Sequence, residues 1–256
     1  MHAYIFLLLA CYAAVHGGPV NLFMDVTIDD RPDLVIVEGD IAFDATSLIP
    51  QLVPLRNAYI KASKWTSGIL PYLIESSQFS AAQITTITNA MRKIEQQTNN
   101  CIRFVQRTNQ PTWIRIYAGT GCWSYMGRTK TSGSQDLSLQ NPGCVSQSII
   151  IHELLHAVGF AHEQTRSDRD TYVTINYNNI QAGKESNFQR YLTSEASTLN
   201  KAYDITSIMH YKWNAFSKNG QPTITPKVNV TQTVMGSAVQ MTDLDIEKVK
   251  TYYACA

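Results

Sequence analysis

The sequence has little charge, and this shortage narrows what the protein can be. Only 16% of its 256 residues are Asp, Glu, Lys or Arg, and 44% are apolar. An average soluble domain has about 25% charged residues, so a highly charged disordered chain is excluded. The formal net charge is only +1, whereas nucleic-acid binding usually needs a clearly basic surface. We expect a globular protein of one sizeable domain or two modest ones, with no nucleic-acid partner.

The chain also lacks an apolar run long enough to cross a membrane. The longest, residues 3–15 (AYIFLLLACYAAV), has no charged residue, but a membrane-spanning helix needs about 20 residues. Followed by the small residues up to Gly17, the run is typical of a secretory signal peptide, with an N-terminal core helix as the alternative. We interpret residues 1–17 as a signal peptide and expect a secreted, extracellular protein without a membrane anchor.

Charge divides the remaining chain into two parts. Residues 18–56 contain two basic and seven acidic residues, a net charge of −5. Residues 57–256 contain the other 19 basic and 13 acidic residues, a net charge of +6. An acidic leader before a basic body is the pattern of a detachable prosegment lying on the domain that it blocks. On charge alone, a solvated acidic linker fits as well.

Cysteine is scarce, and the number of cysteines predicts how many disulfides the protein has. Of five cysteines, Cys11 lies in the signal run and four remain in the body. An even number in a secreted chain indicates two disulfides, and spacing alone leaves all three pairings open. Asn229 begins the triplet Asn-Val-Thr and is a candidate glycosylation site.

Periodic patterns predict the main elements. A strand is expected at 68–75, and alternating segments at 101–107 and 113–119 predict paired strands joined by a turn at 108–111. A capping box predicts a helix from Ser80 to about Gln97. Further helices are expected from about 146 to Gly159 and from Thr242 onward.

The segment that indicates the chemistry of the protein, residues 152–162, begins on the second of these helices. His152 and His156 are four residues apart, so both rings lie on one helix face and can bind one ion. Glu153 is turned from that ion toward a water molecule, whose pKa zinc lowers to about 7. After the turn at Gly159, His162 can reach the same ion. Three neutral nitrogens leave a coordination position open, which is typical of a catalytic zinc.

This segment, HELLHAVGFAHEQTRSDRD, closely resembles the extended zinc signature of the astacin family of metzincin peptidases. Residues 207–211 (SIMHY) resemble that family's Met-turn, and residues 122–127 (CWSYMG) its substrate-binding edge strand. The resemblance covers essentially all of residues 57–256. It implies an α+β, two-lobed zincin fold: an N-terminal twisted mixed sheet with two helices, and a mostly irregular C-terminal lobe with a terminal helix.

The resemblance also implies roles for individual residues. His152, His156 and His162 would bind one Zn²⁺, and Glu153 would be the general base. Tyr211 would be an additional ligand in the resting enzyme that swings away to stabilise the oxyanion. The remaining roles concern support and substrate: Met209 would form an apolar floor below the histidines, and an extended peptide would pair with Trp123, Ser124 and Tyr125.

The resemblance further implies how the chain matures. Arg56-Asn57-Ala58 looks like the family's activation junction, so a trypsin-like protease would cut after Arg56. Glu163 would then pair with the new N-terminus at Asn57. Of the open disulfide pairings, the family pattern selects Cys101 with Cys255 and Cys122 with Cys144.

The prosegment carries an inhibitory motif of the same family. Residues 37–41 (VEGDI) are similar to the pattern Phe-x-Gly-Asp-Ile and depart from it at Val37. Asp40 would occupy the zinc position that water needs. The resemblance as a whole implies a secreted zinc endopeptidase that is made as a zymogen and acts on protein or peptide substrates as a monomer. The rival hypotheses are a binding protein that has lost turnover and a peptidase from another metzincin branch.

Overall fold

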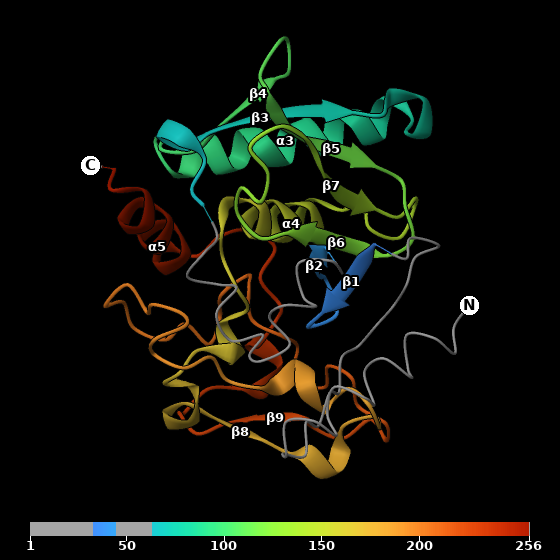
Figure 1. Ribbon diagram of the computed structural model, residues 1–256. Coiled ribbons are helices and arrows are strands. Elements are labelled where there is room, and N and C mark those ends of the chain that lie inside the picture. Colours follow the sequence, from blue (N-terminus) through green and yellow to red (C-terminus); the bar gives the residue numbers. More distant parts are fainter. Residues whose placement is uncertain (1–32, 45–62, 256) are drawn as a thin grey trace, which may run out of the picture.

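Two lobes make up the part of the chain that the computed structural model describes, residues 33–44 and 63–255 (Figure 1). The upper lobe in this view holds a large sheet and two helices, and the lower lobe is mostly irregular chain. The expected signal peptide, the activation junction at Arg56 and Asn57, and the terminal Ala256 lie outside the described residues.

Three α-helices form where their capping residues predict them. Helix α3 (Ala81–Gln97) begins after a capping box between Ser80 and Gln83. Helix α4 (Gln147–Val158) follows Ser146 and ends at Gly159. Helix α5 (Asp243–Tyr253) follows Thr242, whose hydroxyl accepts from the backbone N–H of Asp245. All three helix predictions are confirmed: capping boxes satisfy the first backbone N–H groups of α3 and α5, whereas Ser146 makes no side-chain cap before α4 and the local signal of that helix is Gly159 at its end.

The large sheet has seven strands in the order β1-β2-β6-β7-β5-β3-β4 and mixes parallel with antiparallel pairs. Its strands are β1 (Leu34–Val37), β2 (Ile41–Asp44), β3 (Ile69–Ile74), β4 (Arg103–Gln106), β5 (Thr112–Tyr117), β6 (Cys122–Tyr125) and β7 (Gly133–Leu139). Helices α3 and α4 pack against it in the upper lobe (Figure 1). The predicted α+β fold with a mixed sheet is therefore confirmed.

One predicted pairing is wrong. β4 and β5 do not pair with each other, because β3 lies between them and pairs with both in parallel. β4 pairs with β3 from Ile69 to Tyr72, and β5 pairs with it from Tyr72 to Ile74. The segment at 108–111 therefore carries the chain across β3 instead of closing a hairpin. Strand β7 was not predicted, because several of its buried positions are polar.

The lower lobe is held by few regular elements. It contains a two-stranded antiparallel sheet of β8 (Val173–Ile175) and β9 (Ile224–Pro226). Several short 3-10 helices connect it, namely Glu163–Thr165, Arg169–Thr171, Tyr177–Asn179, Glu185–Phe188 and Gln232–Val234. Others, Thr66–Gly68 and Ser76–Gln78, flank β3 in the upper lobe. A separate apolar cluster around Phe188 and Ile224 forms the core of the lower lobe.

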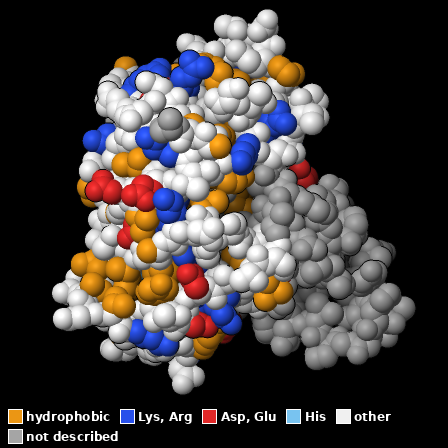
Figure 2. Space-filling model, turned by 90° about the vertical axis from the view of Figure 1, so that its left-hand side faces the viewer, with side chains coloured by type: hydrophobic (Ala, Val, Ile, Leu, Met, Phe, Trp, Pro, Cys, Tyr) orange, Lys and Arg blue, Asp and Glu red, His pale blue; other side chains and the backbone are white. Residues whose placement is uncertain are grey.

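Two disulfides join distant parts of the fold. Cys101 is bonded to Cys255, which ties the end of α5 to the segment before β4. Cys122 is bonded to Cys144, which ties β6 to the segment before α4. On the face that carries α5, Lys and Arg side chains are interspersed with acidic and apolar ones (Figure 2). Among the described residues, no helix has the length and apolarity needed to cross a membrane.

Candidate zinc-binding active site

Helix α4 and the turn after it bring three histidines together. His152 and His156 lie one turn apart, and their Nε2 atoms are 3.1 Å from each other. Gly159 ends the helix with φ +123°, a conformation that side-chain-bearing residues rarely adopt. The chain then turns so that His162 faces the same point, with its ring 4.8 Å from that of His156 between centroids.

Each histidine is oriented through its outer ring nitrogen. Nδ1 of His152 lies 2.8 Å from the carbonyl oxygen of Ile208, and Nδ1 of His156 lies 2.7 Å from that of Phe160. Nδ1 of His162 lies 2.8 Å from the Glu38 carboxylate. Oxygens of these types only accept, so Nδ1 carries the proton in each ring and the Nε2 atoms are left to bind an ion.

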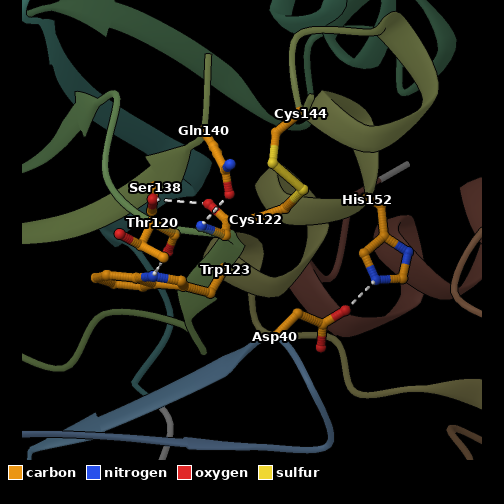
Figure 3. Close-up of a disulfide and its surroundings, with 9 residues drawn as sticks. Asp40, Thr120, Cys122, Trp123, Ser138, Gln140, Cys144 and His152 are labelled. Carbon is orange, nitrogen blue, oxygen red and sulfur yellow. Dashed lines mark hydrogen bonds and ion pairs between the residues drawn. A yellow bond between two sulfur atoms is a disulfide. The ribbon is translucent and has the colours of Figure 1, made fainter. Parts of the chain in front are cut away.

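Asp40 completes the cluster from the turn between β1 and β2 (Figure 3). Its carboxylate oxygens lie 3.2 Å from Nε2 of His152, 3.5 Å from that of His156 and 3.2 Å from that of His162. One donor atom from each of the four residues lies within 4.8 Å of every other. Ligands at 2.0–2.1 Å around a tetrahedral zinc are about 3.3 Å apart, so this donor set fits one zinc ion.

Burial and opposite charges set the protonation of the cluster. Burial lowers the pKa of His156 to about 4, although Asp40 acts in the opposite direction. Burial also opposes the charged form of His162, but the carboxylates of Asp40 and Glu38 outweigh it and raise its pKa to about 9. A metal ion that binds Nε2 of this ring would therefore displace a proton. Burial tends to raise the pKa of Asp40, yet the nearby histidines hold it well below its usual value. The ionised Asp40 is complementary to a divalent cation.

Glu153 lies beside the cluster without belonging to it. It lines a cavity of about 710 Å³ together with Asp40, His152 and Tyr211. Its Oε2 atom is buried and makes no hydrogen bond to any described residue. Burial, and to a smaller extent the charge of Asp40, raise the pKa of Glu153 well above its usual value. A buried carboxyl that lines a cavity and has an oxygen without a hydrogen bond is suited to exchange a proton with a molecule bound there.

The segment of residues 207–211 contacts two of the histidines, through the carbonyl of Ile208 and the ring of Tyr211. Met209 is buried in the main core, and its backbone N–H donates to the Ser207 hydroxyl. The ring of Tyr211 lies 4.6 Å from that of His162 between centroids. The Tyr211 hydroxyl donates to the backbone carbonyl of Glu38. In this structure the turn between β1 and β2 therefore engages the tyrosine as well as the histidines.

The expected substrate strand is β6, and the β1–β2 hairpin covers it. β2 pairs with β6 in parallel, with Ile41 opposite Ser124. Trp123 and Tyr125 are buried against apolar side chains of the hairpin. In the described chain β6 is thus an inner strand, and it would be an edge strand without the hairpin. The Cys122–Cys144 disulfide links this strand to the segment before α4 (Figure 3).

Glu163 is buried behind the third histidine. Its Oε1 atom lies 2.7 Å from Nζ of Lys248 in α5 and 3.1 Å from Arg166. The backbone N–H of Asp204 donates to the same oxygen. Burial raises the pKa of Glu163, while the two cations act to lower it. Its expected partner Asn57 lies outside the described residues, and Asn229 lies exposed on the surface.

Sequence reasoning missed the groups that orient the histidines. The carbonyls of Ile208 and Phe160 carry no sequence signal, because every residue has one. Glu38 does carry a signal, since it is an acid two residues before Asp40 inside the motif already singled out. Tyr191, whose hydroxyl donates to Glu38, is 153 residues away in sequence and could not have been connected to it.

The two-lobed fold and this donor set are those of a zinc peptidase. The family model Astacin, which describes a peptidase family, matches residues 57–254. High choriolytic enzyme 1 of Oryzias latipes is 38% identical over 239 residues, which cover 91% of this chain and 85% of that protein. The chain therefore belongs to the astacin family, as the sequence resemblance implied, and the site is one for a single zinc ion.

Other relatives are longer than this chain. Zinc metalloproteinase nas-15 of Caenorhabditis elegans is 43% identical over 192 residues, 75% of this chain and 32% of that protein. Blastula protease 10 of Paracentrotus lividus is 38% identical over 202 residues, 76% of this chain and 33% of that protein. The chain thus spans about a third of the length of these two. The solved structure of the Oryzias latipes enzyme, described as a hatching enzyme zinc-protease, matches with TM-score 0.68 and 42% identity, covering 76% of this chain and 94% of that one.

Proposed function

We propose that this protein is a secreted zinc endopeptidase, made as a zymogen, that hydrolyses extended protein or peptide substrates. The observation that carries the proposal is the convergence of the three histidine Nε2 atoms and Asp40 beside the Glu153 cavity. Three neutral nitrogen ligands with one replaceable ligand are typical of catalytic zinc sites. The family membership supports the same reaction.

His152, His156 and His162 would hold the ion. When bound, zinc polarises the substrate carbonyl and lowers the pKa of water in its coordination sphere. Glu153 would take the proton from the attacking water and later pass it to the leaving amine. Tyr211, freed from the Glu38 carbonyl, would donate its hydroxyl proton in a hydrogen bond to the developing oxyanion. Met209 would support the histidine cluster from below through packing alone.

Substrate would bind along β6. Once the hairpin leaves, the backbone groups of Trp123, Ser124 and Tyr125 become free to pair with an extended peptide. Pairing through the main chain fixes the position of a scissile bond without demanding particular side chains. Side chains of the substrate could enter the cavity next to Glu153.

Asp40 would keep the enzyme latent until activation. Its carboxylate lies within 3.5 Å of all three Nε2 atoms, and it would thereby exclude the attacking water from the ion. A trypsin-like cut after Arg56 would release the prosegment, residues 18–56, and create the N-terminus at Asn57. Glu163, buried in the wall behind His162, would receive that terminus. The body, residues 57–256, would then act as a monomer.

The test is hydrolysis of a quenched-fluorescent peptide library by the secreted protein, before and after trypsin, with and without a zinc chelator. We expect cleavage only after trypsin, and its loss with chelator. A Glu153→Ala variant should retain one zinc per chain while hydrolysis falls by about 100-fold or more, because only the proton acceptor is removed. A correctly cut, zinc-loaded wild-type protein that cleaves no library peptide and no protein substrate would favour the alternative of a binding protein.

A further inference from the structure

His162 is the histidine that the β1–β2 turn contacts on both sides of its ring. Its Nε2 atom lies 3.2 Å from Asp40, and its Nδ1 atom lies 2.8 Å from Glu38, two residues earlier in the same turn. The other two histidines differ, because their Nδ1 atoms bind carbonyls of the catalytic body at Ile208 and Phe160. Removal of the prosegment would leave those two contacts in place and take away the one at His162.

The Glu38 side chain is built into the site. It is only 7% exposed, and its second oxygen accepts from the Tyr191 hydroxyl. The same residue accepts from the Tyr211 hydroxyl through its backbone carbonyl. A buried carboxylate is costly unless it is paired, and here each oxygen has a polar partner. The position therefore stabilises a carboxylate, and a neutral or apolar side chain would leave the Tyr191 hydroxyl and the His162 ring nitrogen less well paired.

The backbone at Glu38 is also unusual, although it is one of eight non-glycine residues with positive φ in the described chain. Its φ is +52°, in the left-handed region, and that of Gly39 is +80°. Glycine suits the second position, where a Cβ would lie only 2.8 Å from the Phe216 ring. At the first position Gly, Asn or Asp would be favoured, and a glutamate there carries backbone strain. Such strain is usually kept where the side chain has a function.

We propose that Glu38 is a positioning residue of the latent enzyme: it supplies the outer carboxylate of the third zinc ligand, so that the prosegment tightens zinc binding as well as blocking the site. The inference rests on the proposed function, in which His162 binds zinc. A carboxylate that accepts from Nδ1–H fixes the ring and raises the basicity of Nε2, and loss of such a partner typically weakens metal binding by about 10- to 100-fold. Activation would thus exchange a tightly held ion for a more exchangeable one.

The test compares zinc affinities of the uncut full chain by competition with a chromophoric chelator. Glu38→Gln keeps the shape of the side chain and removes its charge, and we expect zinc to bind about tenfold more weakly or worse. Asp44→Asn is the matched control, because it makes the same charge change in the same hairpin but its carboxylate accepts from Tyr125, away from the histidines. Its zinc affinity should stay within about twofold of the wild-type value.

Cutting after Arg56 and separating the freed segment supplies the second measurement. Wild-type and Glu38→Gln bodies are then the same molecule, so their affinities should become equal. Equal affinities of the two uncut chains would overturn the inference, and so would a difference that persists after the segment is removed. Thermal unfolding with excess chelator should give the two uncut chains similar midpoints. Failure of the wild-type chain to bind zinc at all would instead refute the proposed function.

Discussion

Latency should depend on apolar packing of the hairpin as much as on its carboxylates. Leu34 in β1 is 1% exposed and belongs to the cluster with Trp123 and Tyr125 of β6. Leu34→Ala removes buried methyl groups from the contact between the β1–β2 hairpin and β6. Substitutions of this kind cost about 3 kcal/mol, the transfer term plus a cavity term. The loss applies to the closed state only, because an undocked hairpin exposes this side chain.

The expected result is a leaky zymogen. A cost of about 3 kcal/mol raises the ratio of open to closed prosegment by roughly 100-fold. Peptide hydrolysis by the uncut chain, with Arg56→Gln preventing the cut, should rise by the same factor as long as the open state remains a minority. Trypsin-cut wild-type protein gives the upper limit of the activity.

The matched control is Leu70→Ala in the core of the upper lobe. Leu70 is completely buried in β3, among residues of the catalytic body. This variant should lose a similar free energy of unfolding without any rise in the activity of the uncut chain. If Leu34→Ala hydrolyses peptides no faster than the wild-type zymogen, apolar docking of the hairpin does not contribute to latency and the reasoning is refuted.

Three further substitutions test other parts of the structure. Tyr211→Phe in the cut enzyme should lower kcat by about 100-fold with zinc content unchanged, because it removes one oxyanion donor; an unchanged kcat would contradict that role. Lys248→Met should lower the free energy of unfolding, measured in urea, by about 2 kcal/mol, because the buried Glu163 carboxylate loses one of its two cations. The control is Lys250→Met, on the same helix but away from Glu163, which should change the free energy of unfolding far less. Replacing Cys101 and Cys255 by serine opens a 154-residue loop and should cost up to about 5 kcal/mol; no loss in a urea titration would be incompatible with this estimate.

The helices could be predicted because their signals are local. Ser80 with Gln83, and Thr242 with Asp245, lie within one turn of the backbone groups that they cap. Gly159 ends α4 for a reason that is equally local, its positive φ. Such signals act over three or four residues and do not depend on the rest of the fold.

Strand pairing depended on distant residues and was harder to predict. The turn at 108–111 favoured a hairpin, but β3 inserts between the two strands. Strand β7 is buried, but several of its buried residues are polar, so its sequence does not indicate burial. Gln135 is 1% exposed and donates to the Gly127 carbonyl, and Asp136 forms an ion pair with Arg115 of β5. Polar residues satisfied by tertiary contacts lack the alternation that identifies a half-buried strand.

Part of the candidate site could also be predicted from the sequence, and part of it could not. Its side-chain donors on α4 follow from helical spacing, and Asp40 was reached through the family motif. The partners at the outer nitrogens could not be predicted, because the carbonyls of Ile208 and Phe160 are placed by the fold alone. Metal sites depend on such outer contacts for the orientation of the histidine rings. The carbonyl oxygens that the sequence cannot predict therefore contribute directly to the geometry of this site.

A cavity beside Glu153 stays open although the β1–β2 hairpin covers β6. The cavity has a volume of about 710 Å³, and its lining includes the apolar residues Ile149, Met235 and Val239. The described hairpin pairs with β6, contacts Tyr211 and places Asp40 between the histidines, and its turn borders the cavity without filling it. A substrate side chain could enter the cavity, but its peptide bond could neither pair with β6 nor approach the zinc position. Under the proposed function, the described hairpin, residues 33–44, would therefore act at two places, the backbone of β6 and the zinc position.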